Sequence, residues 1–254
     1  RMATWVALLV AGVLLISVVD LALWPGTRDL GVVARPWAAA GSLDESDRVI
    51  TADNVDRLTV AWTYRTGDVS AEEGGRAGTA FEATPVLHGR TLYFSTPYTR
   101  VIALDAATGA ERWTFDPVID RSSHHHKMVT SRGVAIWADA AASQGLCVSR
   151  VFAASYDARL FALDADTGRP CAGFGEGGVI NLRAGVARIE GREHTYLAAP
   201  PPTVIGDLVV MGSTIIDGHH ADAPSGVVRA FDARTGALRW AWEPLPDVGA
   251  VDGN

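Results

Sequence analysis

The fold is decided by the stretch ALDAATGAERW, residues 103–113. Its core returns twice, as LFALDADTG at 160–168 and VRAFDARTG at 228–236. The aspartates stand at positions 105, 164 and 232, so the second and third copies follow after 59 and 68 residues. Self-similarity at this spacing indicates stacked supersecondary units rather than one irregular sandwich.

Each position of the repeated phrase suits a tight turn between two strands. The Asp carboxylate can accept backbone N–H bonds, and the Gly permits a positive φ at the corner. Trp113 follows its Gly by four residues, as does Trp240 in the third copy. A Trp at this fixed place can dock against the neighbouring unit and donate its N–H. The second copy has Ala172 there, so we expect that docking contact to be missing.

Short apolar runs separated by Gly, Asp and Pro continue from residue 35, which is typical of strands and turns. The segment 83–97 predicts two strands joined at His88-Gly89, and 101–104 and 111–115 predict two more around the first turn. Four strands per repeat, arranged radially, form a β-propeller. The sequence therefore predicts an all-β fold with about three to four propeller blades.

Composition excludes several other classes. Hydrophobic residues make up 48% and charged residues 20%, which suits a globular core rather than disorder. The 22 basic and 29 acidic residues give a net charge of −7 with no long basic run, so we expect no nucleic-acid partner. Two cysteines exclude a four-cysteine zinc site and allow one disulfide in an oxidising compartment.

The N-terminal stretch from Trp5 to Trp24 is apolar except for Asp20, and Pro25-Gly26 ends it. A helix of this length spans a bilayer core, with an indole at each interface. An uncleaved anchor is the preferred interpretation; a cleaved signal peptide and a buried soluble helix are the alternatives. The chain starts with Arg1, so this helix could also be the last of several. We thus predict a transmembrane anchor at 1–26, a linker at 27–48 and the propeller at 49–254.

The segments between the repeats carry a family resemblance. NVDRL at 54–58 followed by AWTYRTGD at 61–68, with FEATP at 81–85 and SRGV at 131–134, resembles the quinoprotein dehydrogenases. These enzymes use pyrroloquinoline quinone (PQQ) in an eight-bladed propeller whose repeats carry a tryptophan-docking motif like that of 103–113. The branch indicated is the membrane-bound glucose dehydrogenase type. Eight blades need far more chain than this, so the resemblance implies a partial eight-bladed propeller and an N-terminal portion of a longer protein.

The resemblance also implies a set of cofactor-binding residues. PQQ is a flat quinone with several carboxylates, so its site needs cations and hydrogen-bond donors. Arg65 and Arg132 match cofactor-contacting arginines, and Glu82 matches a glutamate that hydrogen-bonds the cofactor. Ser155 and Thr214 stand where the family places hydroxyl contacts. Without the family, the charged residues would read as solvated strand ends.

The predicted metal ligand is Asp217, which matches a carboxylate that ligates the active-site divalent cation, expected to be Ca²⁺. The glucose dehydrogenase type has Asn after it, whereas this chain has Gly218. Met128 stands where that type has His; His124 to His126 lie upstream, and we expect a solvated loop there rather than a zinc site. No residue matches the catalytic base, which we expect downstream of Asn254.

Cys147 and Cys171 flank neighbouring strands of the second repeat and could approach within bridging distance. The family has a disulfide in a similar place, and a periplasmic location permits one. Two buried free thiols are the alternative.

The resemblance implies a PQQ-dependent dehydrogenase of the bacterial inner membrane with its propeller facing the periplasm. Its substrate would be a glucose-like aldose or an alcohol, and its electron acceptor the membrane quinone. Lacking the base, the 254-residue chain is expected to be inactive alone. A non-catalytic propeller scaffold of PQQ-like repeats, or a degenerate remnant of the enzyme, is the alternative.

Overall fold

A computed structural model describes residues 50–68, 78–119, 129–186, 196–215 and 224–244. Residues 49–254 form one compact unit. The described residues are strands and turns apart from the 3₁₀ helix η2 (Val55–Arg57). None of their helices has the length and apolar character needed to cross a membrane. The predicted anchor at 1–26 and linker at 27–48 lie outside the described residues, and the domain boundaries stay predictions.

The first sheet is antiparallel and has the order β2 (Val86–His88), β3 (Thr91–Ser95), β4 (Val101–Asp105) and β5 (Glu111–Phe115). These are the four strands expected from the sequence, with one difference. Residues 83 and 84 do not open this sheet, because they close β1 (Thr79–Thr84), which pairs with a strand of the second sheet. Pro85 separates the two strands.

The second sheet has the order β1, β6 (Val129–Ala138), β7 (Ser149–Ala154), β8 (Arg159–Asp164) and β9 (Val179–Asn181). β1 lies parallel to β6, with Phe81 opposite Ser131, while the other pairs are antiparallel. The chain therefore contributes β1 to the second sheet before it builds the first one.

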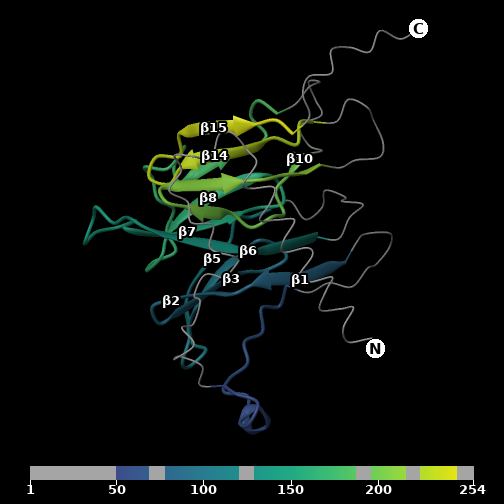
Figure 1. Cartoon of the computed structure of the whole chain (residues 1–254), viewed down its shortest axis with the longest axis vertical. Coiled ribbons are helices and arrows are strands. Elements are labelled where there is room, and N and C mark those ends of the chain that lie inside the picture. The colour runs from purple at the N-terminus through teal and green to yellow at the C-terminus, as the bar shows by residue number, and fades with distance from the viewer. Residues whose placement is uncertain (1–49, 69–77, 120–128, 187–195, 216–223, 245–254) are drawn as a thin grey trace, which may run out of the picture. The chain divides into compact units, whose positions relative to one another are not determined.

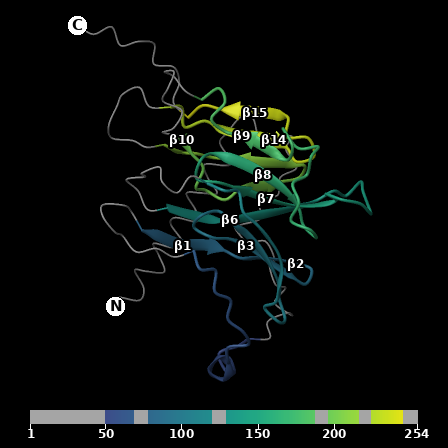
Figure 2. The ribbon, with the colours of Figure 1, turned by 180° about the vertical axis from the view of Figure 1, so that it is seen from behind.

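The third sheet has the order β11 (Thr203–Ile205), β12 (Leu208–Met211), β14 (Val228–Asp232) and β15 (Leu238–Trp242). A two-stranded sheet joins β10 (Tyr196–Leu197) to β13 (Thr214–Ile215). Figures 1 and 2 show the sheets as successive layers, from β2 and β3 to β14 and β15. This arrangement confirms the all-β, partial-propeller prediction for the described residues.

The second sheet lies between two cores. Successive side chains of a strand point to opposite sides, so one strand of this sheet contributes to both cores. On β8, Phe161 and Leu163 pack toward the first sheet, in a core with Tyr93 and Trp113. Leu160 and Ala162 pack the other way, in a core shared with the third sheet. Burying one such large apolar side chain contributes about 1.5–3 kcal/mol, so these two cores hold the layers together.

The three repeated turns are built alike, as predicted. In each, the Gly N–H donates to the carbonyl of the Asp over 2.8 Å, and the Asp Oδ1 accepts from the Thr hydroxyl. The glycines have φ of +71°, +71° and +74°, the left-handed region that favours Gly; they are Gly109, Gly168 and Gly236.

Docking of Trp113 on the next repeat is confirmed. Its indole N–H donates to the carbonyl of Ala165 over 2.9 Å, and its ring covers Gly168 so closely that a Cβ there would lie 2.5 Å away. Trp62 makes the same contact with the first turn, donating to Ala106 over 3.2 Å and covering Gly109. The sequence did not single out Trp62, because it stands outside any copy of the repeated phrase.

Candidate functional site

Two of the predicted site residues meet at the pairing of β1 with β6. The parallel register sets Phe81 opposite Ser131, so the residues that follow them, Glu82 and Arg132, are neighbours. The Nε of Arg132 donates to Oε2 of Glu82 over 3.1 Å. The two side chains are 55% and 41% exposed. The result is an accessible ion pair on neighbouring strands.

The strands that carry this pair are fixed to the first sheet by the residues beside it. Ser131 is buried, and its Oγ lies 2.8 Å from the Oγ of the fully buried Ser95 at the end of β3. The ring of Phe81 packs at 6.0 Å from that of Phe94. Since side chains alternate along a strand, these contacts leave Glu82 and Arg132 outside the packed layer.

Arg65 lies on an extended segment with alternating burial. Trp62, Tyr64 and Asp68 face the first sheet, and Arg65 is exposed. No hydrogen bond or ion pair within the described part of the chain joins Arg65 to Glu82 or Arg132. The segments nevertheless converge, because Tyr64 packs on Phe94 with ring centroids 6.2 Å apart, as Phe81 does.

Arg100 holds the end of this segment and was not found from the sequence. Its Nε donates to Oδ2 of Asp68 over 2.7 Å, and its Nη2 donates to the carbonyl of Thr66. Asp68 is only 6% exposed, and the hydrogen bond to its carboxylate raises the pKa of Arg100. No local pattern links residues so far apart in the chain.

Ser155 is fully buried in the turn between β7 and β8. Its hydroxyl donates to Asp157 and accepts the N–H of Arg159. Arg159 in turn donates to Asp157 over 2.9 Å and to the carbonyl of Pro117 over 2.9 Å. The Ser155 hydroxyl is thus engaged within its own turn and is not brought to the Glu82–Arg132 pair.

An open pocket of about 360 Å³ lies beside this turn. None of the residues predicted for the cofactor lines it; the lining residues are Asp157, Arg159, Glu176, Val179, Asn181 and Arg183.

Thr214 is half-buried in β13, opposite Leu197 of β10. Asp217, Gly218, Met128 and the histidines at 124–126 lie outside the described residues. Within the described ranges, no group of three or more His, Cys, Asp or Glu side chains could hold a metal ion. The metal-ligand prediction therefore stays a prediction.

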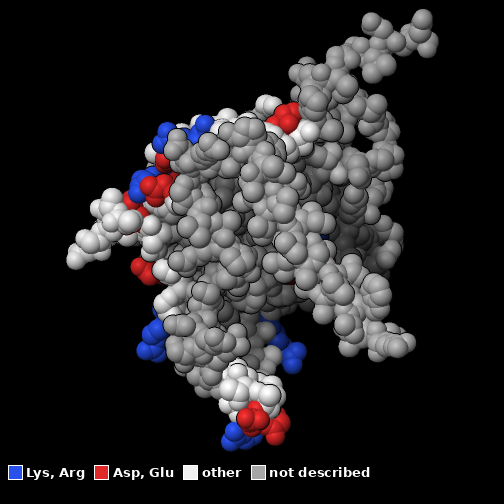
Figure 3. Space-filling model, viewed as in Figure 1, with Lys and Arg blue, Asp and Glu red and all other residues white. Residues whose placement is uncertain are grey.

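Charges of both signs are interspersed over the described residues of the face in Figure 3. Some of the described charged residues are paired locally. Tyr64 donates to Glu111, for example, which lowers the pKa of that carboxyl, while burial and this contact raise the pKa of the tyrosine. Such pairing is consistent with the mixed-charge composition and offers no continuous basic surface in this view.

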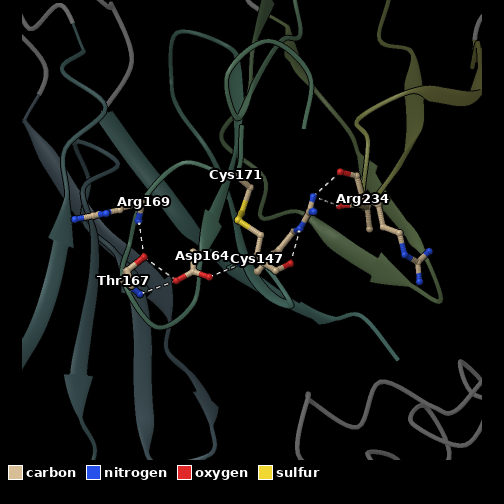
Figure 4. The surroundings of a disulfide bond; sticks show 8 residues. Cys147, Asp164, Thr167, Arg169, Cys171 and Arg234 are labelled. Carbon is tan, nitrogen blue, oxygen red and sulfur yellow. Dashed lines mark hydrogen bonds between the residues drawn. A yellow bond between two sulfur atoms is a disulfide. The ribbon is translucent and has the colours of Figure 1, made fainter. Parts of the chain in front are cut away.

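Cys147 and Cys171 form a disulfide, as predicted, with their Cα atoms 5.8 Å apart. Figure 4 shows it between the turn of the second repeat, marked by Asp164 and Thr167, and Arg234 of the third.

The glucose/ethanol/alcohol dehydrogenase β-propeller domain, a PQQ family, matches residues 45–253. The chain belongs to this family of PQQ-dependent quinoprotein dehydrogenases. Within it, the similarity points to the glucose type. The chain is 35% identical over 233 residues to the quinoprotein glucose dehydrogenase of Escherichia coli (strain K12), covering 88% of this chain and 28% of that protein. It is 34% identical over 248 residues to quinoprotein glucose dehydrogenase A of Acinetobacter calcoaceticus, covering 88% and 29%.

Solved structures agree on the fold. The quinohemoprotein alcohol dehydrogenase ADHIIG of Pseudomonas putida HK5 superposes with a TM-score of 0.53 at 29% identity, over 66% of this chain and 21% of that one. A europium-containing methanol dehydrogenase gives 0.54 at 24% identity, over 77% and 28%; this likeness concerns the fold alone. The chain thus spans less than a third of the length of these relatives.

Proposed function

We propose that this chain forms part of the PQQ-binding propeller of a dehydrogenase that oxidises a glucose-like aldose or an alcohol. The observation that carries the proposal is the exposed Glu82–Arg132 pair, set on neighbouring strands of a domain from this family. Other relatives are named for glycerol and for quinate or shikimate, which supports a sugar or another alcohol as the substrate class.

The chemistry of the pair suits an anionic cofactor. Arg132 uses its Nε for Glu82, and no other ion pair engages its terminal nitrogens within the described residues. A planar guanidinium can present those nitrogens to a carboxylate as a fork. The bond from Nε to Glu82 orients the guanidinium plane, so a second acceptor in that plane must approach the terminal nitrogens from the side that Glu82 does not occupy.

The remaining roles follow from this assignment. Bound PQQ would supply the quinone that accepts the electrons of the alcohol, while the chain's own residues bind and orient it. Arg65 and Thr214 would add contacts to the cofactor, Ser155 would hold the turn between β7 and β8, and Asp217 would ligate Ca²⁺. These roles rest on the family and on the positions of the residues in the sequence.

The cellular setting is also a proposal. A disulfide persists in oxidising compartments such as the periplasm, and the Cys147–Cys171 bond supports placing the propeller there. Residues 1–26 would anchor it in the inner membrane, next to a membrane quinone as electron acceptor.

The test is the affinity of the PQQ-free protein for PQQ, measured by calorimetric titration with and without Ca²⁺. We expect Arg132→Gln to raise Kd about 10–100-fold, because a charge-assisted hydrogen bond to a carboxylate contributes about 1.5–3 kcal/mol. Arg112→Gln is the matched control, since Arg112 is also a partly exposed arginine paired with a carboxylate, that of Asp105 at 2.7 Å. Its Kd should stay within about twofold.

Equal affinities for Arg132→Gln and the control would remove the pair from the cofactor site. Absence of any PQQ binding in the parent protein would favour a scaffold or a remnant.

A further inference from the structure

The third repeated turn is held in a different way from the first two. At Gly236 a Cβ would lie 2.7 Å from the backbone nitrogen of Gly175 and 3.0 Å from Cδ1 of Ile180. At Gly109 and Gly168 the corresponding neighbour is an indole ring. Residues of the second repeat thus occupy the place of a tryptophan, and Ala172 does not leave the turn undocked.

The hydrogen bond of the missing indole is also replaced. In the first two turns the indole N–H donates to the carbonyl of the residue after the Asp, Ala106 or Ala165. In the third turn that carbonyl belongs to Ala233, and it accepts from Nη1 of Arg150 over 2.8 Å. The N–H of Gly175 adds a bond of 2.9 Å to the carbonyl of Thr235.

The disulfide stands where the repeated phrase has an arginine. Arg112 and Arg239 each donate to Oδ2 of their own turn's aspartate over 2.7 Å. The same position in the second repeat is Cys171. There Oδ2 of Asp164 accepts instead from the backbone N–H of Cys147.

Both cysteines are connected to the groups that dock the third turn. The carbonyl of Cys147 accepts from Nε of Arg150 over 3.0 Å. Cys171 begins a tight loop in which the N–H of Phe174 donates to the carbonyl of Cys171. Phe174 is fully buried against Phe152 and directly precedes Gly175.

Arg150 needs this support because it is a poorly solvated cation. It is 9% exposed, its hydrogen bonds go to carbonyls, and its guanidinium lies 5.4 Å from the ring centroid of Trp137. Burial lowers the pKa of Arg150. A buried cation held by neutral acceptors keeps its place only while those acceptors are fixed.

We propose that the Cys147–Cys171 disulfide holds in place the groups that dock the third sheet on the second, and so takes over the role of the tryptophan of the other repeats. It fixes Arg150 through Cys147 and Gly175 through Cys171 against the turn at 232–236. A dithiol reductant delivers two electrons and two protons, so the S–S bond becomes two thiols and the dithiol becomes a disulfide. Reduction therefore loosens the third sheet selectively, whether or not the protein binds PQQ.

The experiment is hydrogen–deuterium exchange with mass spectrometry on the oxidised protein and on the same protein treated with dithiothreitol. We expect peptides from 203–211 and 228–242 to exchange at least tenfold faster after reduction. Peptides from 91–115, docked by Trp62 and Trp113, should change less than twofold. Equal acceleration of both regions, or no change at 228–242 once both thiols are alkylated, would overturn the proposal.

A variant separates docking from general loss of the cross-link. Arg150→Gln keeps the disulfide and removes the guanidinium, so it should reproduce the selective acceleration at 228–242 without reductant. Arg112→Gln is the control: it removes an arginine–aspartate contact from a turn that Trp62 docks, and its exchange should match the parent at both regions. Parent-like exchange at 228–242 in Arg150→Gln would also contradict the proposal.

Discussion

The junction between the first and second sheets differs in chemistry from the junction between the second and third sheets, although each holds the same kind of repeated turn. At the first, Trp113 and Tyr93 both donate to the carbonyl of Ala165, and their rings lie in an apolar core. At the second, Arg150 and Arg234 lie over the ring of Trp137 with guanidinium-to-centroid distances of 5.4 and 4.9 Å. The repeated turn is thus the same at both junctions, whereas the group that docks on it differs.

The second junction also contains a partly exposed cluster of ion pairs. Arg234 is bonded to Asp139 and to Asp207 at 2.7 and 2.9 Å, and 34% of its side chain is exposed. Exposed ion pairs contribute little each, so we expect the stability of this junction to depend mainly on the disulfide and only slightly on the ionisation of these carboxyls. The first should depend on burial.

Trp113→Ala should produce the largest effect, a loss of about 3–5 kcal/mol of unfolding free energy, because it empties an aromatic core site and leaves the Ala165 carbonyl with one donor fewer. Urea unfolding followed by circular dichroism measures it. Trp242→Ala, at a position 57% exposed, is the control and should cost less than about 1 kcal/mol. Similar losses of unfolding free energy in both variants would mean that the docking of Trp113 on the second repeat contributes nothing to stability.

Gly168→Ala should rank second. The new Cβ would lie 2.5 Å from the ring of Trp113 at a φ of +71°, so it adds overpacking to backbone strain, about 2–4 kcal/mol in all. Gly89→Ala meets nothing within 4 Å at a φ of +58° and isolates the backbone part, about 1–2 kcal/mol. The difference between their urea midpoints measures what the neighbouring sheet contributes; equal midpoints would assign the whole effect to φ.

Acid should weaken the second junction. It should also act on Asp105 in the turn of the first sheet, because hydrogen bonds from Arg112 and Thr108 lower the pKa of that carboxyl to about 2. Hydrogen bonds from Arg234 lower the pKa of Asp139 to about 2; for Asp232 the pKa is also about 2, because the bonds from Arg239 and the turn outweigh its burial. A carboxyl whose pKa is lower when folded than when unfolded contributes stability above its unfolded pKa. That contribution is lost as pH falls toward the folded value. Stability should therefore decline between about pH 4 and pH 2.

Asp139→Asn should flatten that decline slightly while lowering stability at pH 7, the smallest of these effects. Pepsin cleavage across pH 2–4 reads it locally, since Asp139→Asn should change the pH dependence of cuts within 203–242 and leave that of cuts within 91–115, the region of Asp105, as in the parent protein. An equal change in both regions would contradict the assignment.

The sequence predicted those parts of the fold that depend on local pattern. The strand at 111–115, the three turns and the Trp113 contact needed only the repeated phrase. It could not show that Ala172 is compensated by Arg150, because nothing along the chain indicates which side chain will fill a gap in a neighbouring sheet. Residues 83 and 84 were placed in the wrong sheet because alternation shows a strand but not its partner.

The candidate site was predicted unevenly for the same reason. Glu82 and Arg132 came from family motifs, and their meeting depends on a parallel pairing that neither motif contains. The Arg100–Asp68 bond, which fixes the segment bearing Arg65, left no signal because each residue alone reads as a surface charge.

The close contact of Trp113 with Gly168 has a consequence for exchanging modules. Trp113 and the Gly168 that it covers belong to different repeats, so a chimera must keep this pair together rather than each repeat. A chimera with a crossover between residues 113 and 168 would join a tryptophan to a glycine turn from another parent. At the second junction, a crossover preserves docking only if Cys147, Arg150 and Cys171 come from the same parent, because the docking group is assembled from two segments of one repeat.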